Sequence, residues 1–115
     1  MSEYKVVFHI DEINKLRLLL NNVGNLLNVA DNKFCIEVVA NSEAVKCYTK
    51  NQDADVDINI MDSLNQKGVK FVACNNALMG YDIKKDALPD FVDIVPAGVM
   101  ELVKKQSEGY FYIKP

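Results

Sequence analysis

The chain has 115 residues, of which 50% are hydrophobic and 25% are charged, and these proportions indicate one globular domain over residues 1–115. Its net charge of −3 argues against nucleic acid as a partner, because phosphate binding requires a basic surface. No apolar run is long enough to cross a membrane and the first residues lack a signal peptide's organisation, so we expect a cytoplasmic protein with no membrane partner.

The first part of the chain alternates strand-like and helix-like segments. Residues 4–10 (YKVVFHI) are β-branched and aromatic, which predicts a strand. Asp11 is a candidate cap for the following helix, in which apolar residues recur at spacings of three and four. Residues 33–40 (KFCIEVVA) predict a second strand, and a short helix is expected over residues 44–49. The apolar stripe of the first helix consists of Ile13, Leu16, Leu20, Val23 and Leu27, widened by Leu18, Leu19 and Leu26.

The remaining segments continue the alternation. Residues 51–57 predict a solvated loop, whose three aspartates lack the glycine and glutamate of a calcium loop. A helix is expected over residues 58–67, ended by Gly68 in the left-handed conformation. The later segments are a strand over 69–74, helical turns over 75–81 and 84–88, a strand over 92–95, a helix over 99–107 and a strand over 110–113.

Strands that alternate with helices indicate a parallel sheet with helices on both faces. The first three strands are almost continuously hydrophobic, as expected of strands that are buried on both sides. The pattern therefore predicts an α/β fold, a three-layer α/β/α sandwich, but leaves the order of the strands open.

Candidate site residues follow from the rule that open parallel sheets bind ligands at the carboxyl ends of their strands. Each predicted strand of this chain except the last ends in a loop of polar or small residues. The candidates in these loops are His9, Asn41, Cys74, Asn75, Asn76, Ala97 and Gly98.

Cys74 is the best candidate for chemistry because it lies where a buried strand meets a helical turn. Backbone N–H groups and the helix dipole at such a position stabilise a thiolate, which is the nucleophilic form of cysteine. Asn75 and Asn76 can cap the turn or donate hydrogen bonds to a charged sulfur. The alternative is that Cys74 is a small buried residue that closes the strand.

The other cysteines and the histidine have less support. Cys35 lies within a predicted strand and Cys47 within a short helix, so we expect packing roles, with Cys47 partly buried. His9 is the only histidine, and it is either a proton donor and acceptor for a nearby thiol or a structural residue. Three widely spaced cysteines and one histidine predict neither a disulfide framework nor a metal site.

The segment around Ala97 and Gly98 precedes a helix, where N–H groups could face an anion. The chain contains neither a Walker motif nor the Gly-rich pattern of dinucleotide-binding loops, so the support for a nucleotide site is weak and no cofactor is expected.

Three stretches of the chain resemble the DsrE/DsrF-like family of small sulfur-relay proteins. Residues 68–78 (GVKFVACNNAL) are similar to the family's strand, cysteine and following turn. Residues 95–103 (VPAGVMELV) resemble its V-P-S-G-V-x-E-L segment, and residues 106–115 (QSEGYFYIKP) its Q-x-E-G-Y-x-Y-I-K-P ending.

The resemblance implies a parallel five-stranded sheet and assembly into homo-oligomers, commonly trimers or hexamers. It also implies that a cysteine carries sulfane sulfur as a persulfide, between donor and acceptor proteins, and Cys74 occupies the matching position. The expected function is therefore that of a sulfur carrier or sulfurtransferase. The first alternative is a non-catalytic homo-oligomeric binding protein, in which the C-terminal segment 110–115 (YFYIKP), with its apolar residues on an edge strand, and the aliphatic helices build the subunit contacts. The second is a small-molecule or nucleotide binder.

Overall fold

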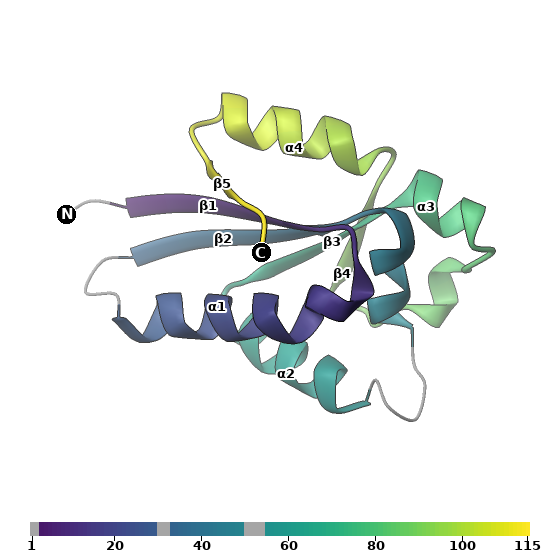
Figure 1. The fold of residues 1–115 in the computed structure, drawn as a ribbon, viewed down its shortest axis with the longest axis horizontal. Coiled ribbons are helices and arrows are strands. Elements are labelled where there is room, and N and C mark those ends of the chain that lie inside the picture. The colour runs from purple at the N-terminus through teal and green to yellow at the C-terminus, as the bar shows by residue number, and fades with distance from the viewer. Residues whose placement is uncertain (1–2, 30–32, 50–54) are drawn as a thin grey trace.

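The computed structural model describes residues 3–29, 33–49 and 55–115, which form one sheet with helices on both faces (Figure 1). The five strands are all parallel and lie in the order β4-β3-β2-β1-β5. The predicted α/β class and three-layer arrangement are confirmed. The strands are β1 (Glu3–Ile10), β2 (Lys33–Ala40), β3 (Lys70–Cys74), β4 (Val92–Val95) and β5 (Phe111–Ile113).

Helices connect successive strands, as the alternating pattern predicts. Within the described ranges, no helix is both long and apolar enough to cross a membrane. The α-helices are α1 (Leu16–Val29), α2 (Asp55–Gln66), α3 (Asn75–Gly80) and α4 (Gly98–Ser107), and the 3-10 helices are η1 (Ile13–Lys15), η2 (Ser42–Tyr48) and η3 (Lys85–Ala87).

The chain reverses its direction across the sheet after β4. From β1 to β4 each strand is added beside the previous one, and α1 and α2 lie on one face (Figure 1). The next strand, β5, lies at the opposite edge beside β1, so α4 crosses the other face of the sheet. Right-handed crossovers require this change of face when the direction of strand addition reverses.

The larger part of the core lies between the sheet and the α1/α2 layer. Phe8, Leu19 and Met61 are fully buried there, on β1, α1 and α2 respectively. The core under α4 is smaller, because its buried members are Val7, Val39, Val72 and Leu102. Burial on both faces explains why the central strands read as nearly continuous hydrophobic runs.

Several local predictions differ from the structure. Asp11 does not cap the first helix; it forms an ion pair with Lys114 at 3.3 Å, and the N–H of Ile13 instead donates to Glu43 Oε2 at 3.0 Å. Leu18 on α1 and Ile13 on η1, both expected in the apolar stripe, are exposed. In the predicted loop, α2 already begins at Asp55, and residues 51–54 lie outside the described ranges.

The aspartate at the end of that predicted loop is not merely solvated. Asp57 is on α2, and its Oδ1 accepts a hydrogen bond from Arg17 Nε of α1 at 2.5 Å. The contact joins the two helices of one layer across 40 positions of sequence, which is a separation that no local pattern predicts.

Gly68 has φ +100°, so the predicted left-handed end of α2 is confirmed. Its N–H donates to the carbonyl of Asn65, and that of Val69 donates to the carbonyl of Leu64. These bonds satisfy carbonyls at the end of the helix and direct the chain into β3, the strand that ends at Cys74.

Candidate functional site

At the carboxyl ends of the neighbouring strands β3 and β4, the chain leaves the two strands toward opposite faces of the sheet. Cys74 and Val95 are paired in the register of these two strands. The chain leaving β3 enters α3, whose Leu78 packs into the core of the α1/α2 face, whereas the chain leaving β4 enters α4 on the other face. Open α/β sheets bind ligands at such divergence points, and Cys74 lies at this one.

Cys74 is the residue that immediately precedes α3, with φ −76° and ψ 117°. Its side chain is buried, and the residue is 7% exposed. It is followed by the first N–H groups of α3, which have no partner within their own helix. Within the described ranges no side chain caps this helix, and the N–H of Asn76, in its first turn, donates to a backbone carbonyl of the loop before α4.

Gly98 brings the beginning of a second helix to Cys74. A Cβ atom placed on Gly98 would lie 3.2 Å from Cys74 Cβ and 3.1 Å from Asn41 Cβ. The first residue of α4 therefore packs closely against both residues because it lacks a side chain. Ala97, in extended conformation, precedes it, and among the described residues no side chain caps α4.

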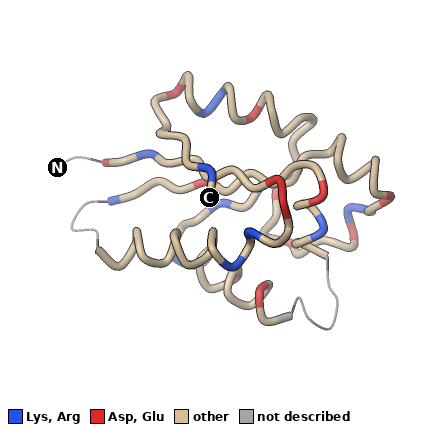
Figure 2. The backbone as a smooth tube through the Cα atoms, in the orientation of Figure 1, with Lys and Arg blue, Asp and Glu red and all other residues tan. Residues whose placement is uncertain are grey.

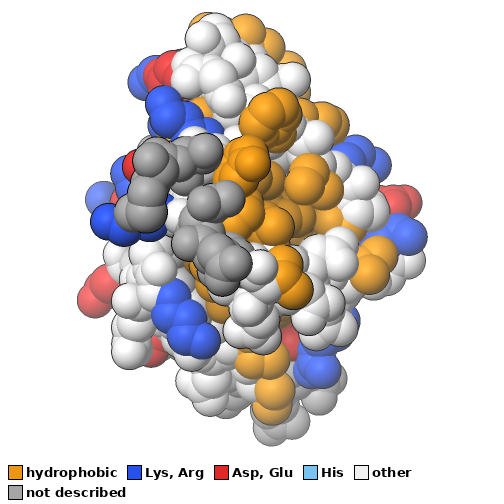
Figure 3. Space-filling model, turned by 90° about the vertical axis from the view of Figure 1, so that its left-hand side faces the viewer, with side chains coloured by type: hydrophobic (Ala, Val, Ile, Leu, Met, Phe, Trp, Pro, Cys, Tyr) orange, Lys and Arg blue, Asp and Glu red, His pale blue; other side chains and the backbone are white. Residues whose placement is uncertain are grey.

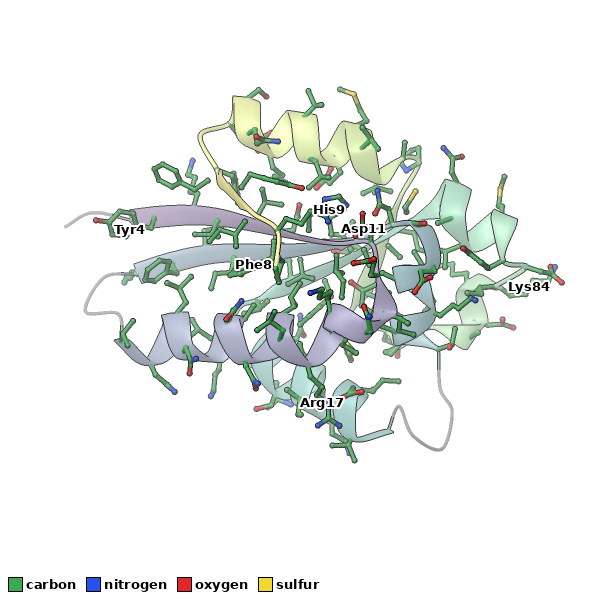
Figure 4. All side chains as sticks on the ribbon, in the orientation of Figure 1. Tyr4, Phe8, His9, Asp11, Arg17 and Lys84 are labelled. Atoms are coloured by element: carbon green, nitrogen blue, oxygen red, sulfur yellow. The ribbon has the colours of Figure 1, made fainter. Side chains whose placement is uncertain are left out.

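Asn41 connects the cysteine to the end of β1. Its backbone N–H donates to the carbonyl of Ile10 at 3.1 Å, which fixes the turn after β2 against β1. Its side-chain Oδ1 is 2.8 Å from His9 Nε2, and His9 Nδ1 is 2.6 Å from the hydroxyl of Tyr112 on β5. Figure 4 shows His9 and Asp11 at the same end of β1.

The strand order decides how His9 relates to Cys74. β2 lies between β1 and β3, so His9 and Cys74 are on strands that are not neighbours. Asn41, directly after β2, lies between them. The structure therefore brings His9, Asn41, Cys74 and Gly98 to one end of the sheet, with the histidine linked to the cysteine's surroundings through the asparagine.

The two asparagines after Cys74 make different contacts. Asn75 Nδ2 donates to Met79 Sδ at 3.6 Å, which is a weak contact one turn away. The backbone N–H of Asn76 donates to the carbonyl of Pro96 at 3.3 Å and ties the start of α3 to the loop before α4. An open surface hollow of about 360 Å³ adjoins this loop, and its lining residues include Asn75, Val95 and Pro96.

Neither of the other two cysteines closes a strand, because Cys47 is in η2 and Cys35 is inside β2. Cys47 was expected to be partly buried, but it is 3% exposed because η2 packs it into the core. Burial raises the pKa of its thiol, which disfavours the reactive thiolate. Cys35 is half-buried in the first half of β2, where its Sγ lies 3.1 Å from the hydroxyl of Tyr110.

Two residues of interest were missed by the sequence analysis. Tyr112 was noted there only as part of an apolar segment, and its contact with His9 depends on β5 pairing with β1. Glu37, in the middle of β2, is 4% exposed, and its Oε2 has no hydrogen-bond partner among the described residues. Glu37 could have been noticed in the sequence, because it is a charged residue inside an otherwise hydrophobic strand.

Burial raises the pKa of Glu37 to about 8, and the nearby Glu101 carboxylate of α4 contributes in the same direction. Lys105 and Lys70 oppose the shift, and Lys105 Nζ lies 4.0 Å from Glu37 Oε1. Glu37 is on β2 under α4, well before the carboxyl end of the strand, so we assign it no part in the candidate site.

The family model described as the DsrE/DsrF-like family matches residues 5–115. Among solved structures, a protein of unknown function from Methanobacterium thermoautotrophicum, MTH1491, is 38% identical, with a TM-score of 0.86 over 97% of this chain and 99% of that chain. The ychN protein from E. coli is 17% identical, with a TM-score of 0.67 and full coverage of both chains. BT1422 from Bacteroides thetaiotaomicron, of unknown function, is 16% identical, with a TM-score of 0.74 over 96% and 94% of the chains.

A search of curated proteins gave no match. The two structures below 25% identity support the fold, whereas MTH1491 is similar in both sequence and structure over nearly its whole length. With the family model covering almost every residue, the chain belongs to the DsrE/DsrF-like family.

Proposed function

We propose that the protein is a cytoplasmic sulfur carrier that holds sulfane sulfur as a persulfide on Cys74. The observation that carries the proposal is the position of Cys74, which closes β3, precedes α3 and contacts the first residue of α4. Membership of a family that is associated with sulfur relay supports the same role. A reducing cytoplasm would keep the cysteines as thiols, as this chemistry requires.

Two helices, α3 and α4, begin beside Cys74. Unpaired N–H groups and the positive ends of the helix dipoles both stabilise an anion. The proposed contacts for a charged sulfur or for the incoming persulfide are the backbone groups of Ala97 and Gly98 and the amides of Asn41, Asn75 and Asn76. His9 contributes through Asn41, because β2 separates it from Cys74.

The proposed transfer is a thiol–persulfide exchange without net oxidation. The Cys74 thiolate attacks the outer sulfur of a donor persulfide, R–S–SH. A new S–S bond forms to Cys74, the donor's S–S bond breaks, and R–S⁻ leaves and takes up a proton from solvent. An acceptor thiolate then attacks the outer sulfur of the Cys74 persulfide, and Cys74 leaves as the thiolate.

Incubation with a persulfide donor tests the proposal by intact-mass spectrometry. We expect an adduct of about 32 Da, removable by dithiothreitol, on the unmodified protein and none on Cys74→Ser. Cys35→Ser and Cys47→Ala are the matched controls, and both should retain the adduct. Equal labelling of Cys74→Ser and the unmodified protein, or no adduct on either, would show that Cys74 is not a carrier.

A second candidate function, that of a homo-oligomeric binding protein, is favoured by exposed apolar side chains. On α4, Val99 and Met100 are 64% and 61% exposed, and on β5 Phe111 is 64% exposed. Figure 3 shows hydrophobic side chains gathered on the end of the molecule at which β1 and β2 begin. Members of the family are generally oligomeric, and we propose that copies of this chain cover these residues in a trimer or hexamer.

Light scattering after size exclusion tests this assembly. We expect Met100→Lys combined with Val103→Glu to reduce the measured mass to that of one chain, because charge on a buried apolar interface is strongly unfavourable. Leu18→Glu is the control, since it places a charge on an exposed leucine of α1, on the opposite face of the sheet. An unchanged mass for the α4 variant would exclude α4 from the interface.

A further inference from the structure

The contacts around His9 determine which ring nitrogen carries the proton. Asn41 Oδ1, 2.8 Å from Nε2, can only accept a hydrogen bond, so Nε2 must be the donor. In the neutral ring Nδ1 is then an acceptor, and the hydroxyl of Tyr112, 2.6 Å away, must donate to it. With a neutral ring, Tyr112 therefore donates to His9, and His9 donates to Asn41.

Tyr112 is suited to the donor position. Partial burial raises the pKa of its phenol, with Lys114 opposing and Asp11 reinforcing the shift, so the hydroxyl keeps its proton at neutral pH. β5 holds the residue in register with Val7, two positions before His9 on the neighbouring strand. The tyrosine thereby restrains the rotation of the imidazole ring.

The hydrogen bond from His9 also determines which polar group of the Asn41 side chain is left for Cys74. Its Oδ1 is occupied by His9, so Nδ2, a donor with two hydrogens, is the remaining polar group of the side chain. The Cβ atoms of Asn41 and Cys74 both lie close to the vacant Cβ position of Gly98, so the two side chains start side by side. An N–H donor near a sulfur stabilises negative charge on it.

We propose that Tyr112 is a positioning residue, which acts through His9 to hold the Asn41 amide with its N–H groups toward the sulfur of Cys74. Among the described residues, Asn41 Nδ2 makes no hydrogen bond to the Cys74 thiol. The outer sulfur of a persulfide would extend about 2 Å beyond Sγ and meet the amide more closely. The inference rests on the proposed role of Cys74, but its test does not require sulfur transfer.

The test uses Tyr112→Phe with Tyr110→Phe as a matched control, because Tyr110 is on the same side of the chain's last segment but contacts Cys35 instead. His9 is the only histidine, so ¹⁵N NMR reports its two ring nitrogens without overlap. We expect the resonance of Nδ1 to change in Tyr112→Phe and to stay unchanged in Tyr110→Phe, at a pH where the ring is neutral.

The second readout is the rate at which iodoacetamide modifies Cys74 in a Cys35→Ser background. We expect a several-fold decrease in Tyr112→Phe and the original rate in Tyr110→Phe. An unchanged Nδ1 resonance would disprove the hydrogen bond, and a changed resonance with an unchanged rate would disprove the positioning role. Since neither readout uses a persulfide, failure of the sulfur-carrier proposal in the mass measurement would be recognised separately.

Discussion

At roughly pH 9 we expect the Glu37→Gln variant to unfold at a higher temperature than the unmodified protein. Glu37 is buried under α4, and its pKa is raised from 4.5 to about 8 in the folded chain. An acid with a raised pKa binds its proton more tightly in the folded state. The stabilisation of the folded state by the protonated Glu37 carboxyl is therefore fully present below pH 4.5. It is lost as the pH rises from 4.5 through 8.

Between pH 4.5 and pH 8 we expect the free energy of unfolding to fall by about 4 kcal/mol, since one pKa unit corresponds to about 1.4 kcal/mol. Glutamine is neutral at every pH, so the variant should lack this decline and should differ least from the unmodified protein near pH 4. Thermal unfolding followed by circular dichroism across this range measures both curves. Glu12→Gln, at an exposed position, is the control and should leave the pH dependence intact. Parallel curves for Glu37→Gln and the unmodified protein would contradict a neutral buried carboxyl.

Gly98→Ala should lower the free energy of unfolding by about 1–2 kcal/mol and slow the modification of Cys74. The added methyl would lie 3.1 Å and 3.2 Å from the Cβ atoms of Asn41 and Cys74. Cβ atoms are fixed to the backbone and cannot rotate away, so α4 or the two strand ends must move. Chemical denaturation and the rate of Cys74 alkylation measure the two effects.

Gly24→Ala is the matched control, because Gly24 is inside α1 and a Cβ atom there would meet nothing within 4 Å. We expect this change to stabilise the protein by about 0.5–1 kcal/mol, since alanine favours the helix. If Gly98→Ala were equally stabilising and Cys74 reacted at its normal rate, the close packing of α4 on the cysteine would be refuted.

Much of the fold could be predicted from the sequence because local patterns encode it. The β-branched runs and the alternation of segments indicated the parallel sheet, and β2 and β4 begin and end at the predicted residues. The exceptions depend on distant partners. Asp11 has the right side chain for a cap, but Lys114 pairs with it and Glu43 takes over the N–H of Ile13.

The site was predictable only in part, for the same reason. Strand ends are visible in the sequence, so Cys74, Asn41 and Gly98 could be nominated, and the structure brings them together. The order of the strands is not visible in the sequence. The separation of His9 from Cys74 and the hydrogen bond between Tyr112 and His9 could therefore not be foreseen. The charges gave little guidance, because acidic and basic residues are scattered over the chain and neither kind is gathered at one place (Figure 2).

The reversal of direction after β4 has a consequence for the order of folding. β1 to β4 pair with strands that are near in sequence, whereas the contact between His9 and Tyr112 spans 103 positions. Closing so long a loop carries a higher entropic cost, which makes such contacts late to form. A folding intermediate with four strands already paired would therefore contain Cys74 and Asn41 but an imidazole that is free to rotate, and would acquire the arrangement of its thiol site only when β5 docks.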